Sequence, residues 1–283
     1  MATFTNQARM TYNNTTTLSN VVTGELLGSL EATKTATADT YAIGDVLTYV
    51  VALRGTGATS LAGLTLTDDL GAYTAGGVTR YPLTYTDGSL LVYQNGTLIT
   101  TPTVQATQPL TVTGIPVSAG GSTVIVYTAT VNELAPPTVG GTITNTATVT
   151  GQGVGTAVSA SETVTTADSP LLRIEKRIEP VPVEENGTLT YTLTILNYGN
   201  TAAIATDNVS VTDVFDPILT GLTVTYEGVT WTEGGEYTYD ETTGTFVSTP
   251  GAITVPAATY TENPDGGYTT VPGTVTLVIT GTV

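Results

Sequence analysis

Hydrophobic and polar residues alternate along much of the chain with a period of two. Residues 44–53, 122–131 and 141–150 are such segments, and in 141–150 threonine fills one face while the other carries Ile143, Ala147 and Val149. Because successive side chains of a strand point to opposite faces, this pattern predicts strands buried on one side. Glycine and asparagine separate the segments, as expected for turns. No segment has an amphipathic pattern of helical period, so we predict an all-β chain.

The strand pattern recurs at a fixed spacing. The two lysines, Lys34 and Lys176, lie 142 positions apart (176 − 34), and the same offset relates Tyr49 to Tyr191. Self-similarity at a constant offset indicates two copies of one unit. We therefore predict two tandem immunoglobulin-like β-sandwich domains, residues 25–166 and 167–283, of about seven strands each when complete.

The two copies differ in their closing strands. In the first copy, residues 141–150 and 161–165 follow the strand that ends at Val131; in the second, Val283 corresponds to Val131 and no such pair follows. The missing strands match the other end of the chain instead, because residues 3–8 resemble 142–147 and residues 19–23 resemble 161–165. We expect residues 1–24 to form a closing hairpin and the second domain to be incomplete.

An incomplete sandwich leaves backbone groups and apolar side chains uncovered, which favours the addition of a strand. A whole domain separates residues 1–24 from the second domain, so we predict that they insert into the neighbouring subunit. The donor strand would carry Phe4, Asn6, Ala8 and Met10. A head-to-tail contact repeated in this way builds a filament of identical subunits unless it closes into a ring.

Composition excludes several classes of function. With 7 basic and 24 acidic residues the net charge is −17, which repels nucleic acid and anionic membranes. No stretch is long and apolar enough for membrane insertion, and the first residues lack the basic and apolar regions of a secretory signal. The chain has no histidine and no cysteine, so the usual zinc ligands, thiol nucleophiles, disulfides and histidine-dependent triads are missing. We therefore predict that the protein is not an enzyme.

Several motifs occur in matching order in the two copies. They are residues 44–49 and 186–191, the turn at 197–200, residues 144–147, and the Thr-Asp pairs that end at Asp68 and Asp213. Together they cover most of both copies and resemble the repeat of bacterial and archaeal surface proteins known as domain of unknown function 11. The resemblance implies a β-sandwich protein of the cell surface.

A more distant resemblance lies in the arrangement of a lysine on the first strand and an asparagine on the last. This arrangement resembles that of Gram-positive pilin and adhesin sandwiches, which form Lys–Asn isopeptide bonds spontaneously. In that chemistry burial favours the neutral lysine amine, a protonated carboxyl group polarises the asparagine amide, and ammonia is lost. For the first domain the resemblance implies Lys34 as nucleophile, Asn145 as electrophile and Asp68 as the acid. Asp69 is an alternative acid.

The second domain has Lys176 and Asp213 but no asparagine on a final strand. Asn6, on the donated strand, corresponds to Asn145. The resemblance therefore implies a covalent bond between Lys176 of one subunit and Asn6 of another. Glu175 is the alternative acid here.

Other groupings suggest different ligands. Asp68 with Asp69, Asp213 with Asp216, and Glu184 with Glu185 are candidate calcium ligands without EF-hand spacing; we predict no other metal and no cofactor. Trp231, Tyr226, Tyr237 and Tyr239 could instead form a glycan-binding platform or pack across strands.

Two interpretations follow. The first is a structural protein: a subunit of an extracellular or spore-surface filament, resembling a pilus, joined by donor-strand complementation and isopeptide bonds. The second is a monomeric adhesin or stalk module that binds a surface ligand. Subunits that assemble should give large, denaturant-resistant species, whereas the module should remain a monomer.

Overall fold

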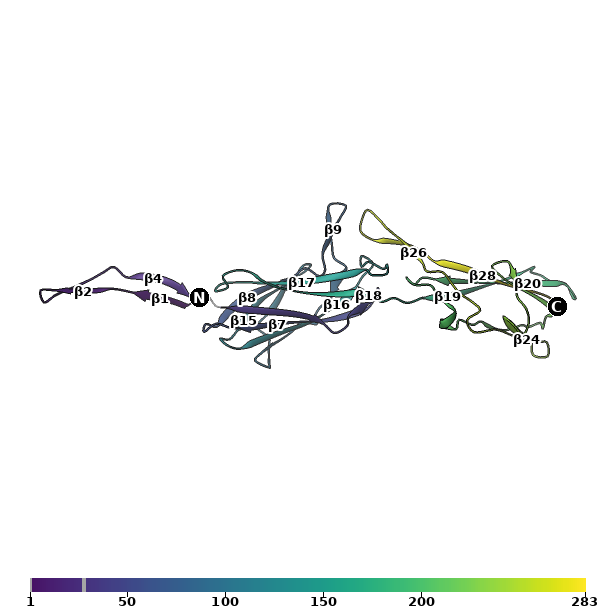
Figure 1. Cartoon of the computed structure of the whole chain (residues 1–283), viewed down its shortest axis with the longest axis horizontal. Helices are drawn as coiled ribbons and strands as arrows, with labels where there is room; N and C mark the ends of the chain where they lie inside the picture. The colour runs from purple at the N-terminus through teal and green to yellow at the C-terminus, as the bar shows by residue number, and fades with distance from the viewer. Residues whose placement is uncertain (1, 27–28) are drawn as a thin grey trace. The chain divides into compact units, whose positions relative to one another are not determined.

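The computed structural model describes residues 2–26 and 29–283. The expected all-β class is confirmed, since the only helical segment of the described residues is the 3-10 helix η1 (Ala205–Asp207). Figure 1 shows the order of the strands along the chain. The chain divides into two compact units. The first comprises residues up to Pro136 with Gly140–Thr166 and Pro264–Gly267, and the second comprises Pro137–Val139, Ala167–Asn263 and Tyr268–Val283.

Residues 2–26 form an antiparallel hairpin, called the N-terminal hairpin below. Its outer pair is β1 (Ala2–Asn6) with β4 (Val22–Leu26), and its inner pair is β2 (Arg9–Tyr12) with β3 (Thr15–Leu18). The two-residue turn is Asn13-Asn14, both with positive φ, as the tightest hairpin turns require.

The apolar side chains of the N-terminal hairpin are exposed. Phe4, Met10 and Leu18 each expose more than half of their surface. Neither hydrophobic core formed by the described residues includes a residue of this hairpin. An exposed two-stranded hairpin is at best marginally stable in water, so its own packing does not explain why these positions are apolar.

Two sheets form the sandwich of the first unit. The first sheet has the order β13-β12-β16-β7-β5, and β11 also pairs with β16. Its strands are β5 (Leu30–Ala36), β7 (Val46–Gly55), β11 (Leu83–Tyr85), β12 (Leu91–Gln94), β13 (Thr97–Ile99) and β16 (Ser122–Val131). The second has the order β14-β15-β8-β17-β18-β6. Its strands are β6 (Thr40–Tyr41), β8 (Leu61–Asp68), β14 (Thr103–Thr107), β15 (Leu110–Val117), β17 (Thr142–Thr150) and β18 (Val158–Thr166). A separate hairpin joins β9 (Tyr73–Ala75) to β10 (Val78–Arg80).

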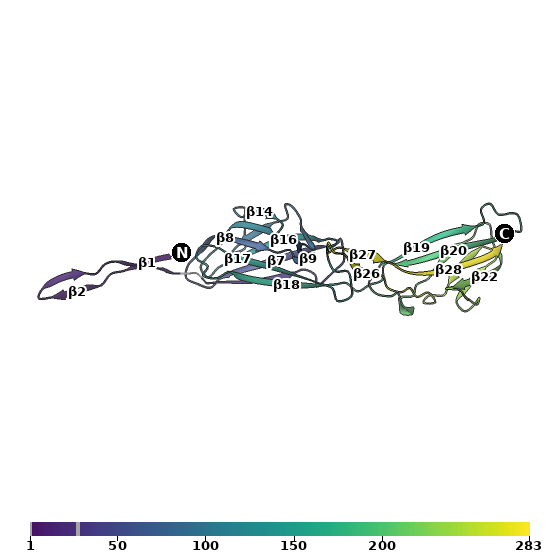
Figure 2. The same ribbon diagram turned by 90° about the horizontal axis from the view of Figure 1, so that it is seen from above.

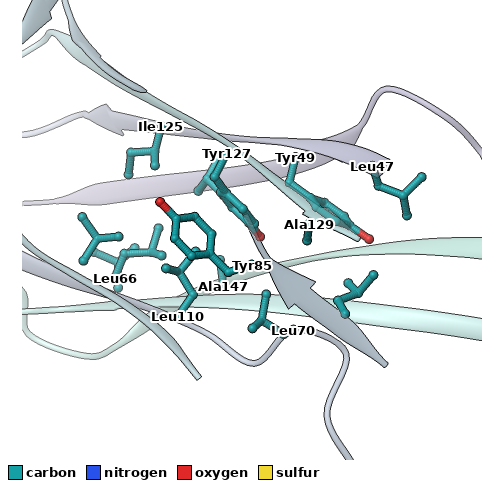
Figure 3. Packing of buried hydrophobic residues seen from close by; sticks show 14 of the residues in the cluster. Leu47, Tyr49, Leu66, Leu70, Tyr85, Leu110, Ile125, Tyr127, Ala129 and Ala147 are labelled. Carbon is teal, nitrogen blue, oxygen red and sulfur yellow. The ribbon is translucent and has the colours of Figure 1, made fainter. Parts of the chain in front are cut away.

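The core of the first unit lies between these sheets. Alternate residues of β7 and β16 are buried and face buried residues of β8, β15 and β17, as period-two patterning predicts. Figure 3 shows Tyr49, Tyr127 and Tyr85 close together within this core, with Ala147 nearby. The rings of Tyr49 and Tyr127 are stacked, with centroids 5.6 Å apart.

The second unit has smaller sheets (Figure 2). The larger, β19-β20-β28-β22-β23, contains β19 (Leu172–Glu179), β20 (Thr188–Asn197), β22 (Thr220–Tyr226), β23 (Val229–Thr230) and β28 (Gly273–Thr282). The second, β21-β25-β24, contains β21 (Thr212–Val214), β24 (Tyr237–Asp240) and β25 (Thr245–Ser248). A hairpin pairs β26 (Thr259–Glu262) with β27 (Tyr268–Val271).

Strand register identifies the corresponding positions of the two units. Tyr49 of β7 lies opposite Tyr127 of β16, and Tyr191 of β20 lies opposite Ile279 of β28. Thus β20 corresponds to β7 and β28 to β16, and Ile279 stands where the first unit has Tyr127.

The two units differ on one side of the second sheet. In the first, β8 pairs with β15 on one side and with β17 on the other. In the second, the matching strand β21 pairs with β25, and its other side is the edge of the sheet. Within the described residues the second unit therefore has no counterpart of β17 and β18.

Candidate functional site

Lys34 lies on β5 with its side chain turned into the first unit. Only 5% of the residue is exposed, although lysine is almost never buried without a partner. Ala32 and Ala36, two positions away on either side, also pack against the core. The β18 strand lies beside β5 and covers this edge. The strand pattern therefore buries Lys34, and its charge must be compensated inside the protein.

Asp68 supplies the compensating group. It ends β8 and is fully buried, and its Oδ2 lies 2.5 Å from Lys34 Nζ. Its Oδ1 accepts a hydrogen bond from the backbone N–H of Leu70, at 3.1 Å. Removing one partner of such a buried pair typically costs about 3–5 kcal/mol, because the other charge is left uncompensated.

Two further side chains complete the cluster. The Tyr127 hydroxyl, from β16, donates to Asp68 Oδ2 at 2.6 Å. Asn145, from β17, is fully buried and donates from Nδ2 to the Tyr127 hydroxyl at 3.1 Å. Asn145 Oδ1 has no hydrogen-bond partner among the described residues. The second sheet thus contributes the acid and the amide, and the first sheet contributes the amine and the phenol.

Burial controls the electrostatics of this cluster. Desolvation lowers the pKa of Lys34 below its ordinary value, against the opposing influence of Asp68. Desolvation also raises the pKa of Tyr127 well above its ordinary value, with Asp68 acting in the same direction. A lysine whose pKa is lowered by burial, next to a carboxyl group and a buried primary amide, has the groups needed for amine attack on that amide.

The predicted residues of the first domain are therefore brought together in one buried cluster. Asp68, and not Asp69, contacts Lys34; Asp69 Oδ1 instead accepts from the N–H groups of Gly71 and Thr146. Whether the Lys34–Asn145 bond forms stays a prediction.

The second unit holds a partial version of the cluster. Lys176 Nζ lies 2.5 Å from Asp213 Oδ2, and 41% of the lysine side chain is exposed. The amine also lies over the ring of Tyr191, 4.4 Å from its centroid. Glu175 is exposed on the neighbouring position, so the acid paired with Lys176 is Asp213. Ile279 provides no hydroxyl, and within residues 2–26 and 29–283 no asparagine hydrogen-bonds to Lys176 or Asp213.

The exposed edge explains why Lys176 is less buried than Lys34. From Arg173 to Glu179 every residue of β19 is exposed, including Ile174 and Ile178, which flank Lys176 on its own face. These isoleucines correspond to Ala32 and Ala36, which β18 helps to cover in the first unit. The second unit thus exposes the apolar face that its counterpart buries.

Asn6 lies on β1 of the N-terminal hairpin and is exposed, opposite Val22. In the first unit the inward-facing residues of β17 are Ile143, Asn145, Ala147 and Val149. The hairpin positions that match them by sequence are Phe4, Asn6, Ala8 and Met10. Asn6 thus has the strand position of Asn145 but no buried amine beside it.

Sequence reasoning missed Tyr127. Its counterpart in the second unit is isoleucine, and β28 is displaced from the 142-residue offset, so the repeat did not single it out. The available signal was the alternation along β16, which places Tyr127 on the buried face with Ile125 and Ala129.

The remaining candidate sites are not supported. The carboxylates of Asp68 and Asp69 already bond within the protein, and no group of three or more His, Cys, Asp or Glu residues that could hold a metal occurs among the described residues. Trp231 and Tyr237 are buried in the second core, and Tyr226 stacks on Trp231. Of the two alternatives for these aromatic residues, the contacts favour packing within the unit.

No family model matches the chain, so the expected resemblance to domain of unknown function 11 is not confirmed. No curated protein matches either. Among solved structures the chain is similar to the pilus backbone RrgB from Streptococcus pneumoniae, at 12% identity and a TM-score of 0.35, over 90% of this chain and 50% of that one. It thus spans about half the length of RrgB.

Two further pilins have comparable similarity. They are BcpA, the major pilin subunit of Bacillus cereus (14% identity, TM-score 0.36, 96% of this chain and 73% of that one), and the major pilin SpaD from Corynebacterium diphtheriae (14%, 0.35, 86% and 59%). No helix of the described residues is long and apolar enough to cross a bilayer.

Proposed function

We propose that the chain is a structural subunit of an extracellular filament, assembled head to tail by insertion of the N-terminal hairpin into the second unit of the next subunit. One observation carries the proposal. The first unit shows a complete sheet in which β17 and β18 cover β8 and β5, whereas the second unit leaves β21 and β19 uncovered. The N-terminal hairpin matches β17 and β18 in sequence and exposes its apolar face.

The first unit supplies the template for insertion. Ala147 lies opposite Asp68 in the ladder between β17 and β8, so its match Ala8 would lie opposite Asp213 of β21. Phe4 and Met10 would then face the second core. Full burial of a phenylalanine or methionine side chain contributes about 1.5–3 kcal/mol each, and the backbone of β21 would gain a ladder partner.

Covalent bonds then stabilise the filament. Within the first unit, the Lys34 amine attacks Asn145 Cγ, an amide forms and one ammonia is released. The bond closes a loop of 111 residues (145 − 34); by analogy with a disulfide, such a link stabilises a fold by about 4–5 kcal/mol. Between subunits, Asn6 of the inserted strand meets Lys176, and Asp213 acts as the acid.

Substitutions on the two faces of β1 test insertion. Phe4→Asp places a charge on the inserted face and should abolish polymerisation, because a buried unpaired carboxylate is strongly disfavoured. Thr5→Asp is the matched control, since Thr5 corresponds to the exposed Thr144, and it should still polymerise. Electron microscopy and sedimentation measure the outcome.

Deletion of residues 2–24 provides an independent check. The truncated chain should fold and remain monomeric, and a peptide of residues 1–24 added to full-length protein should stop growth by occupying the second unit. If the truncated chain makes normal filaments, hairpin insertion is wrong. If the intact chain stays a monomer, the alternative of a monomeric binding module is favoured.

A further inference from the structure

Tyr127 stands in the middle of a chain of contacts that joins the amine to the amide. Lys34 Nζ contacts Asp68 Oδ2 at 2.5 Å, the Tyr127 hydroxyl donates to the same oxygen at 2.6 Å, and Asn145 Nδ2 donates to that hydroxyl at 3.1 Å. All of these groups are buried. A proton can therefore pass between the two reacting nitrogens without reaching solvent.

The hydroxyl also fixes the orientation of the amide. A phenol has one proton, and Tyr127 gives it to Asp68, so toward Asn145 it can only accept. The NH2 group of Asn145 must then face Tyr127, which leaves Oδ1 without a partner. The nitrogen that has to leave as ammonia is thus the atom held against the hydroxyl.

We propose that Tyr127 is a catalytic residue of isopeptide formation, relaying a proton from Asp68 to the leaving nitrogen of Asn145. This inference rests on the proposed Lys34–Asn145 bond. An amide nitrogen is a poor leaving group unless it is protonated, and a positioned acid typically contributes a factor of about 100 or more. The hydroxyl carries its proton at neutral pH, because the ordinary pKa of tyrosine is about 10 and burial raises the pKa of Tyr127 further.

The protons balance as follows. The Lys34 ammonium transfers a proton to Asp68, and the neutral amine attacks Asn145 Cγ. Tyr127 gives its proton to Nδ2 and takes the proton of Asp68 in the same relay. Asp68 then accepts the remaining extra proton from the Lys34 nitrogen. The Cγ–Nδ2 bond breaks, leaving the amide, ammonia and a protonated Asp68; Tyr127 is unchanged.

Tyr127→Phe tests the relay, since it removes the hydroxyl and keeps the ring that stacks on Tyr49. Full-length chains collected unfolded in urea, before they react, are refolded by dilution and quenched at intervals. Intact mass reports the loss of ammonia, and circular dichroism reports folding. We expect Tyr127→Phe to fold at the wild-type rate and to lose ammonia about 100-fold more slowly.

The matched control is Tyr85→Phe. Tyr85 lies beside Tyr127 in the same core, with ring centroids 6.3 Å apart, and its hydroxyl has no hydrogen-bond partner among the described residues. This variant should react at the wild-type rate. If Tyr127→Phe folds poorly, Tyr127→Ile takes its place, because isoleucine occupies the corresponding position of the second unit.

The outcomes separate the two proposals. A wild-type mass that never falls by one ammonia overturns the Lys34–Asn145 bond and the relay with it. A wild-type mass that falls, with equal rates in wild type, Tyr127→Phe and Tyr127→Ile, overturns the relay alone. Equal slowing in Tyr127→Phe and Tyr85→Phe would also overturn it, because the effect would then belong to core packing.

Discussion

The two lysines show how the surroundings of one residue type decide its chemistry. Lys34 and Lys176 each pair with an aspartate at 2.5 Å and lie near the ring of a tyrosine on the adjacent strand. Burial lowers the pKa of Lys34, whereas the Lys176 side chain is 41% exposed. In the proposed assembly the inserted strand would supply the burial that Lys176 lacks, which would couple the chemistry of this second site to assembly.

Substitution of Asn6 separates the covalent bond from strand insertion. Asn6→Ala should still assemble, because Phe4, Ala8 and Met10 remain to insert, but its filaments should dissociate to monomers in boiling detergent. Wild-type filaments should give a ladder of covalent multimers on a denaturing gel. Lys176→Ala should behave like Asn6→Ala, since it removes the other half of the same bond.

The matched control for this experiment is Asn20→Ala, which changes an exposed asparagine of the same hairpin outside its strands. Its ladder should persist. Tandem mass spectrometry of wild-type multimers should find the peptides containing Asn6 and Lys176 joined. Wild-type filaments that melt entirely to monomer would remove the intersubunit bond and leave strand insertion standing.

At the scale of elements, the N-terminal hairpin and its template differ in register. Ile143 lies opposite Val164 between β17 and β18, and the matching residues are Phe4 and Val22. In the hairpin, Phe4 instead lies opposite Gly24, and its ring covers the space that a side chain at Gly24 would need. A shift of two residues keeps every side chain on its own face, so the strand can slide without exchanging its faces.

Engineered disulfides test whether insertion requires this slide, and the absence of native cysteine makes them unambiguous. Thr5 lies opposite Thr23 in the hairpin, whereas the template register places Thr5 opposite Val21. We expect oxidised Thr5→Cys/Thr23→Cys to be locked in the free register and unable to polymerise until reduced. Oxidised Thr5→Cys/Val21→Cys should polymerise.

Turbidity with and without reductant measures both variants. Equal polymerisation of the two oxidised variants would show that the hairpin inserts without changing register. If Thr5→Cys/Val21→Cys fails to polymerise in both redox states, the substitutions themselves disturb insertion. The reduced form of Thr5→Cys/Thr23→Cys is the control for this effect, because it carries cysteines but no disulfide.

The sequence predicted the strands well and their pairing less well. Alternation specified which residues of β17 are buried, because burial of one sheet face is a local property of the strand. In β7 and β16 apolar residues such as Val50 and Val126 also lie on the outward face, so alternation alone was less decisive there. The register of the N-terminal hairpin could not be read in this way, since the Asn13-Asn14 turn sets it and two registers place the same residues on the same face. Tyr127 was missed for a related reason, because its role depends on three other strands.

At the scale of the whole chain, charge is unevenly distributed. Arg9 is the only charged residue of 1–24, whereas residues 167–283 carry 15 acidic and 3 basic residues, a net charge of −12 (3 − 15). Residues 1–24, which exclude Glu25 of β4, are therefore attracted to the unit that would receive them. Two copies of the 283-residue chain, each with a net charge of −17, repel one another at distances up to the Debye length, about 10 Å at 0.1 M salt.

These opposing effects predict opposite salt dependence for two related reactions. Polymerisation of the full chain should become faster as salt rises from about 10 to 300 mM, because screening weakens the repulsion between subunits. The second reaction is the binding of a peptide of residues 1–24 to the chain that lacks residues 2–24. The peptide is acetylated and amidated so that Arg9 is its only charge. Its binding should weaken as salt rises, because salt screens its attraction to the second unit. Light scattering follows the first reaction and fluorescence anisotropy of a labelled peptide the second. An Arg9→Gln peptide should bind with little salt dependence. If both reactions respond to salt in the same direction, net charge does not govern the encounter between the N-terminal hairpin and the second unit.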